Sequence, residues 1–71
     1  MRYLVVLEQG PTSFGAYVPD LPGCVAAADS REEALRLIRE AIELHIGDLR
    51  QSGQPVPPPS STGELIAVHA A

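Results

Sequence analysis

The segment that most constrains the fold is an amphipathic stretch that predicts one long helix from about Arg31 to Ser52. Ser30 is a suitable N-cap, and Glu33, three positions later, completes the pattern of a reciprocal capping box. Gly53 can adopt the left-handed conformation that ends a helix, and Pro55 prevents the helix from continuing. Apolar side chains recur at spacings of three and four, at Leu35, Ile38, Ile42, Ile46 and Leu49. The helix can therefore cover one face of a sheet.

Four runs outside the helix predict strands, at Arg2–Glu8, Phe14–Val18, Cys24–Ala28 and Gly63–Val68. The third is rich in alanine, a poor strand former, and is assigned because little else fits between the preceding turn and the helix. The helix and the extended link QPVPPPS at 54–60 form a connection of about 30 residues, long enough for a crossover to a parallel last strand. The sequence thus predicts one α+β domain over residues 1–71: a two-layer β-β-β-α-β arrangement with one helix packed on a small, mostly antiparallel sheet.

The first strand is apolar on both sides, which is unusual for a sheet with one face in water. Tyr3, Val5 and Leu7 lie on one side, and Leu4 and Val6 on the other. The chain is 45% hydrophobic and only 20% charged, and a domain of this size has a thin core. We therefore expect a homo-oligomer, a dimer or higher, that uses the uncovered sheet face or edge, with Tyr3, Val5 and Leu7 as candidate interface residues.

Charge and composition exclude several function classes. The formal net charge is −4, and the five arginines, with no lysine, form no basic stripe for nucleic acid. A single cysteine cannot make an internal disulfide, so the chain is not a small disulfide-stapled secreted fold. The opening segment has only four consecutive aliphatic residues, too few for a signal-peptide core or a membrane span. A cytoplasmic protein is the expectation.

No motif points to catalysis, a cofactor or a metal. Cys24 has no local base to activate it and is expected to be a small buried hydrophobe, while His45 lies beside the apolar stripe of the helix. Asp20 and Asp29 flank the third strand and could hold a magnesium ion, but the turn explains Asp20 better and the helix start explains Asp29. The proline run could bind an SH3 or WW domain, although a spacer role is favoured.

A turn with two prolines, an aspartate and a glycine lies within AYVPDLPGCVAAAD at residues 16–29. Together with the opening YLVVLE, the helix DSREEALRLIREAIELH and the link GQPVPPPS, this stretch resembles the HicB-like antitoxins of bacterial HicA/HicB toxin–antitoxin pairs. The resemblance covers residues 2 to about 60 and implies a partial RNase H-like fold without RNase activity. It further implies that the partner is HicA, a small basic RNA-cleaving toxin that such an acidic domain occludes.

Many members of this family continue into a DNA-binding domain, so DNA binding is not expected for the 71 residues of this sequence. The candidate partner-binding residues lie in the turn: Tyr17, Pro19, Asp20, Leu21, Pro22 and Gly23. The same residues could instead only shape the turn. Alternative functions are a stand-alone scaffold or small-ligand-binding domain with no toxin, and a metal-dependent nuclease remnant that uses Asp20 and Asp29.

Overall fold

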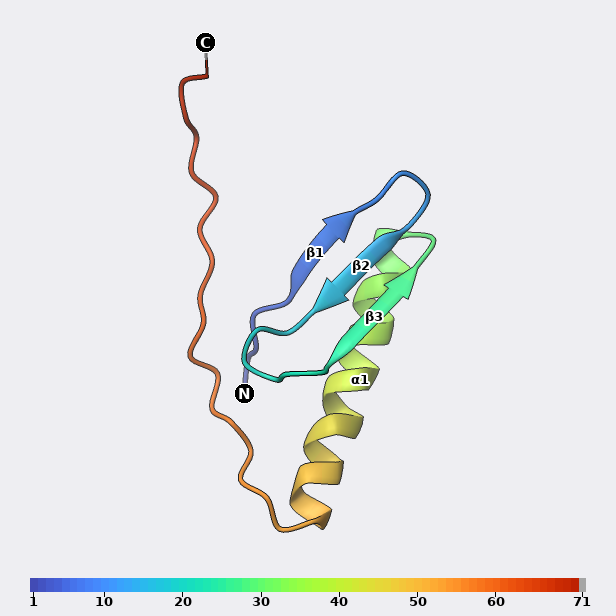
Figure 1. Cartoon of the computed structure of the whole chain (residues 1–71), viewed down its shortest axis with the longest axis vertical. Helices are drawn as coiled ribbons and strands as arrows, with labels where there is room; N and C mark the ends of the chain where they lie inside the picture. Colours follow the sequence, from blue (N-terminus) through green and yellow to red (C-terminus); the bar gives the residue numbers. More distant parts are fainter. Residues whose placement is uncertain (71) are drawn as a thin grey trace.

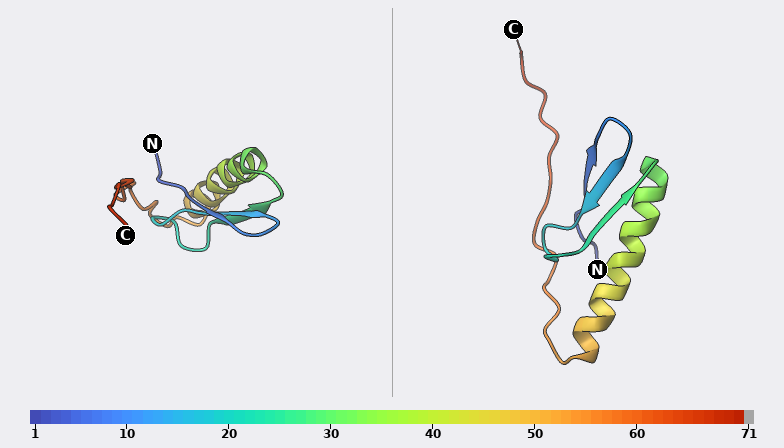
Figure 2. Two further views of the ribbon diagram at one scale, coloured as in Figure 1. Left: turned by 90° about the horizontal axis from the view of Figure 1, so that it is seen from above. Right: turned by 45° about the vertical axis from the view of Figure 1, so that its right-hand side comes forward.

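The computed structural model describes residues 1–70, which form three strands followed by one helix: β1 (Val6–Gln9), β2 (Phe14–Tyr17), β3 (Val25–Ala28) and α1 (Arg31–Gln51). The strands lie in the order β1-β2-β3, and each neighbouring pair is antiparallel. The sheet forms one layer and α1 the other, so that one face of the sheet is covered and the other is open (Figures 1 and 2). The predicted α+β class with one helix on an antiparallel sheet is confirmed.

The register of the sheet decides which side chains face the helix. Leu7 is paired with Ala16, and Ala16 with Ala26, so these three side chains share one face. Ala16 is buried, and Leu7 and Ala26 pack against the core. The neighbouring row, Val6, Tyr17 and Val25, therefore lies on the open face.

The core is small and lies between the sheet and the middle of the helix. Leu21 and Ile38 are its largest fully buried side chains. Ala16, Val18 and Cys24 complete the buried cluster. Ala34 is also fully buried, one turn before Ile38 on α1. Of the apolar stripe predicted from the sequence, Ile38 is buried in the core and Ile42 packs against it.

Both predicted ends of the helix are present. The Ser30 hydroxyl accepts a hydrogen bond from the Glu33 backbone N–H at 3.1 Å, although the Glu33 side chain pairs with Arg36 instead of returning to Ser30. The capping box is therefore formed in one direction only. At the other end, Gly53 has φ +73°, and its N–H and that of Gln54 donate to carbonyls of the last helical turn. This is the hydrogen-bond pattern of a Schellman motif.

The first strand is shorter than the predicted Arg2–Glu8, because its partner strand turns away. Val6 pairs with Tyr17, and the next residue of β2, Val18, donates its N–H to the Cys24 carbonyl within the turn. Pro19, which would follow, has no N–H to donate. Residues 2–5 therefore precede β1 and are not hydrogen-bonded to β2 as part of the sheet.

The predicted fourth strand at Gly63–Val68 is wrong for the described chain, where residues 54–70 contain neither helix nor strand. This tail leaves the end of α1 and runs upward in Figure 1 on the side of β1 without joining the sheet. The first part of the tail is held by hydrogen bonds outside the sheet. The Pro57 carbonyl accepts one from the Tyr3 hydroxyl, and Ser60 and Ser61 donate to Asp20 in the 18–24 turn. The order of elements is β-β-β-α, and the crossover to a parallel strand does not occur.

Candidate functional site

The turn between β2 and β3 consists of two successive four-residue turns. Leu21 N–H donates to the Val18 carbonyl and Cys24 N–H to the Leu21 carbonyl, both at 3.1 Å. Each proline follows the first residue of its turn, the position that its fixed φ favours. Gly23 has φ +85°, which together with the preceding Pro22 is typical of a type II turn. The sequence pattern PDLPG thus determines this corner.

Asp20 is the most strongly bonded polar side chain of the turn. Its carboxylate accepts four hydrogen bonds from the tail, from the backbone N–H and the hydroxyl of both Ser60 and Ser61, at 2.7 to 3.2 Å. The Ser61 backbone bond, the Ser61 hydroxyl and the Ser60 backbone bond lower the pKa of Asp20 to about 2. Asp20 therefore attaches the tail to the turn, a role that was not predicted from the sequence.

The six candidate partner-binding residues differ in accessibility. Leu21 is 0% exposed and supports the turn from inside. Pro19, Pro22 and Gly23 are exposed at the corner, and Tyr17 is 38% exposed on the open face of the sheet. With Asp20 committed to the tail, the accessible members of the set are Tyr17, Pro19, Pro22 and Gly23.

The open face of the sheet carries an apolar row that crosses all three strands. Tyr17 stands at its centre, between Val6 on β1 and Val25 on β3. Val25, the first residue of the edge strand β3, is 65% exposed. Val25 was not among the residues predicted from the sequence, although strands that pair about a turn centred on Leu21 place it opposite Tyr17.

The three candidate interface residues of the N-terminal segment lie on the opposite side from this row. Tyr3, Val5 and Leu7 pack against the buried cluster, on the face that meets the helix. All three remain partly exposed. Tyr3 and Val5 also line a groove between the N-terminal segment and α1. Each of these side chains thus contacts the core with one part and is exposed to solvent with another.

The structure also places the remaining candidate residues, Cys24, Asp29 and Asp20. Cys24 is buried in the core, as predicted from the sequence. Burial raises the pKa of its thiol, which makes the thiolate harder to form. Asp29 is exposed before the helix, and Asp20 is occupied by the two serines. Within residues 1–70, no three His, Cys, Asp or Glu side chains converge as a metal-binding group. In the same residues, no helix has the length and apolarity needed to cross a membrane.

A family model described as "HicB_like antitoxin of bacterial toxin-antitoxin system" matches residues 3–70. The chain belongs to the HicB-like antitoxin family. This HicB-like chain also resembles a chain of a solved structure, the HicA3 and HicB3 toxin–antitoxin complex, with a TM-score of 0.70 and 30% identity. That similarity covers 83% of this chain and 70% of the other.

Three curated proteins are also similar to this chain. A UPF0150 protein of Helicobacter pylori is 54% identical over 44 residues, and these cover 62% of this HicB-like chain and 61% of the relative. Antitoxin HicB 2 of Photorhabdus laumondii is 33% identical over 93% of this chain, which spans 48% of that protein. A UPF0150 protein of Thermoplasma acidophilum is 34% identical over 99% of this chain and 100% of its own length.

Proposed function

We propose that this chain is an antitoxin-like, protein-binding module that neutralises a HicA-type RNA-cleaving toxin by occluding it. The observation that carries the proposal is the similarity to a chain of the HicA3 and HicB3 toxin–antitoxin complex, at a TM-score of 0.70. In this role the chain acts by binding and not by catalysis. The family membership supports the same class of function.

The toxin-binding surface in this proposal is the open face of the sheet with the adjoining corner. Tyr17 and Val25 give it an apolar centre, and Pro19 and Pro22 extend it at the turn. Aromatic and aliphatic side chains at the centre of a patch are typical of protein interfaces. The turn is held rigidly by its own hydrogen bonds, so little conformational entropy is lost when a partner binds.

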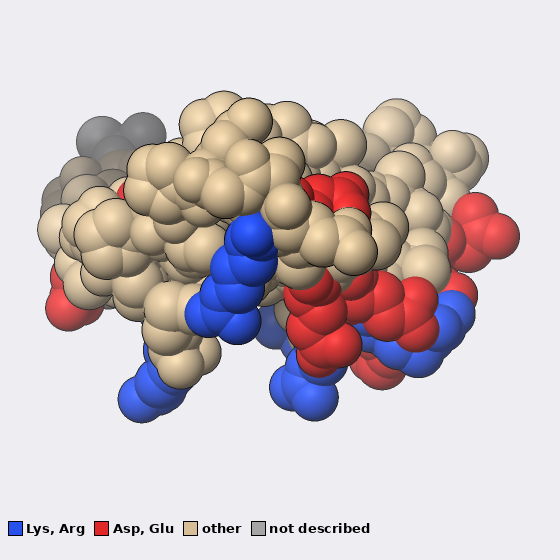
Figure 3. Space-filling model, turned by 90° about the horizontal axis from the view of Figure 1, so that it is seen from below, with Lys and Arg blue, Asp and Glu red and all other residues tan. Residues whose placement is uncertain are grey.

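The charge of the chain supports a basic partner. The formal net charge is −4, and the sequence pI is about 4.9. In the view of Figure 3, most of the charged side chains lie along the lower side of the molecule, and the upper side is mostly uncharged. Net negative charge would then speed the encounter with a basic toxin, while the uncharged side provides the contact.

A homo-oligomer, a dimer or higher, belongs to the same proposal, with Tyr3, Val5 and Leu7 at or near its interface. These side chains are only partly buried in one chain, although they adjoin the core. A second copy could cover their exposed part without blocking the open face of the sheet. The two surfaces lie on opposite faces and can therefore be occupied together.

The proposal is tested by binding to a purified HicA-type toxin, measured by calorimetry and by inhibition of RNA cleavage. Val25→Asp places a charge at the β3 end of the apolar row on the open face. Gln54→Asp adds the same charge at an exposed position just after α1. We expect Val25→Asp to weaken binding about tenfold or more, and Gln54→Asp to leave it unchanged.

Absence of binding by the unchanged chain would contradict the antitoxin role. Equal losses in the Val25→Asp and Gln54→Asp variants would contradict the choice of the open face. Circular dichroism of each variant checks that the fold is retained.

A further inference from the structure

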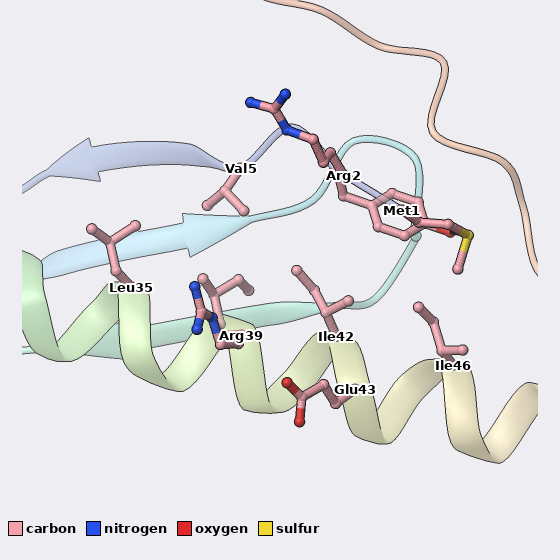
Figure 4. Close-up of a pocket in the computed structure, with 10 residues that line it drawn as sticks. Met1, Arg2, Val5, Leu35, Arg39, Ile42, Glu43 and Ile46 are labelled. Carbon is pink, nitrogen blue, oxygen red and sulfur yellow. Dashed lines mark hydrogen bonds between the residues drawn. The ribbon is translucent and has the colours of Figure 1, made fainter.

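A groove of about 630 Å³ lies between the N-terminal segment and the helix. It exists because α1 packs mainly across β3 and β2, which leaves the helix side of the first strand incompletely covered. Its lining is mostly apolar, and in Figure 4 Val5 faces Leu35 while Ile42 and Ile46 project into the same space. The groove is therefore an open extension of the core.

At Gly63 the chain's own tail lies on the other side of the N-terminal segment, against Leu4. A Cβ added at Gly63 would lie 3.4 Å from Leu4 Cδ1, in direct contact. Leu4 alternates with Tyr3 and Val5, which line the groove, so Gly63 lies on the side turned away from it. The hydrogen bonds from Tyr3 to Pro57 and from Ser60 and Ser61 to Asp20 fix the tail on this route.

Beyond Gly63 the tail exposes three large apolar side chains in a short stretch. Leu65 is 102% exposed, and Ile66 and Val68 are each 78% exposed. Such a cluster of fully accessible aliphatic side chains gains free energy when an apolar surface covers it. The same molecule thus contains an uncovered apolar groove and an uncovered apolar segment that its own fold keeps apart.

We infer that the groove receives residues 64–68 from a second copy of this chain, in a reciprocal exchange that forms a dimer. Five residues in extended form cover about 16 Å. The helix rises by about the same length between Leu35 and Ile46, the two ends of the apolar lining. The inserted segment therefore matches the groove in length as well as in polarity.

Charge also favours this occupant. The groove is bordered by Arg2, Arg39 and Glu43, two cations and one anion. The inserted segment carries one charged residue, Glu64, which can pair with an arginine at the rim. Because each copy offers one groove and one tail, a two-fold exchange fills both grooves and closes the assembly. This inference rests on the homo-oligomer of the proposed function, but it does not depend on toxin binding.

The first experiment measures the mass of the full chain by sedimentation equilibrium between about 1 and 100 μM, a range in which weak and moderate dimers are distinguished. Leu65→Asp/Ile66→Asp places two charges in the inserted segment. His69→Asp/Ala70→Asp places two charges in the same tail outside it. We expect the unchanged chain and the control to dimerise, and the first variant to dissociate at least tenfold more readily. A monomer throughout the range, or equal dimerisation of both variants, would overturn the inference.

A second experiment separates exchange from a tail that folds back on its own chain. One preparation carries Ile46→Cys and another Leu65→Cys, and the two are mixed and oxidised. Cys24 is present in both and is buried. A disulfide-linked heterodimer is expected, since the two new cysteines meet only between copies. A third preparation carries both changes in one chain. If the mixture gives no heterodimer and this third chain forms an internal disulfide as a monomer, the exchange is overturned.

Discussion

Asp20 binds Ser61 twice, accepting the backbone N–H at 2.9 Å and the hydroxyl at 2.7 Å, although the two residues are 41 positions apart. Ser60 adds the same two kinds of bond to the same carboxylate. The corner of the sheet and the tail after the helix are thus joined by one side chain. The Tyr3 hydroxyl donates a hydrogen bond to the Pro57 carbonyl at 2.5 Å, which holds the tail three residues before Ser60.

Asp20→Asn should release the tail without unfolding the domain, because the neutral amide has one carbonyl oxygen in place of the two that accept these bonds. We expect the backbone amides of Ser60 and Ser61 to exchange with solvent about tenfold faster, while the amides of α1 are unchanged. Hydrogen exchange followed by NMR measures both. Asp48→Asn, at an exposed helical position, is the control, and slow exchange at Ser60 and Ser61 in Asp20→Asn would contradict this role.

The attachment of the tail should depend on pH in the acidic range. The hydrogen bonds favour the ionised carboxylate and lower the pKa of Asp20 from 3.8 to about 2. A lowered pKa in the folded state means that the contribution is complete above pH 3.8 and is lost as the pH falls through about 2. NMR titration of the Asp20 carboxyl carbon should show the low midpoint, with the Ser61 amide shift following it. A midpoint near 3.8 would show that the tail is not attached.

Ile38→Ala should be strongly destabilising because Ile38 is almost fully buried at the centre of the core. Removal of a large buried aliphatic side chain typically costs about 2–5 kcal/mol. Urea unfolding measures the loss. Leu44→Ala is the matched control on the same helix, and its exposed position predicts a change within about 0.5 kcal/mol. Similar losses at both positions would contradict the assignment of the core.

Two glycines near the end of α1 should respond oppositely to alanine. At Gly47 an added Cβ meets nothing within 4 Å, so Gly47→Ala should stabilise the helix by about 0.5–1 kcal/mol. Gly53 has φ +73°, and a side chain in this left-handed conformation costs about 1–2 kcal/mol. Thermal unfolding should therefore give a higher melting temperature for Gly47→Ala and a lower one for Gly53→Ala than for the unchanged chain.

The sequence by itself determined the elements whose causes are local. Ser30 and Gly53 limit the helix through hydrogen bonds to residues within a few positions, and Pro19, Pro22 and Gly23 shape the corner through their own allowed backbone angles. These preferences act over one turn of chain, so they can be recognised without knowledge of the packing. The family resemblance rested on the same stretches and is confirmed.

Only the tertiary structure decided what the two apolar sides of the first strand face and where the tail runs. Alternation separates Tyr3, Val5 and Leu7 from Leu4 and Val6, but the position of the helix determines which set adjoins the core. The expected last strand does not form, and bonds between residues 40 to 54 positions apart fix the preceding link instead. Such contacts depend on how the layers bring distant segments together, and local sequence carries no signal for them.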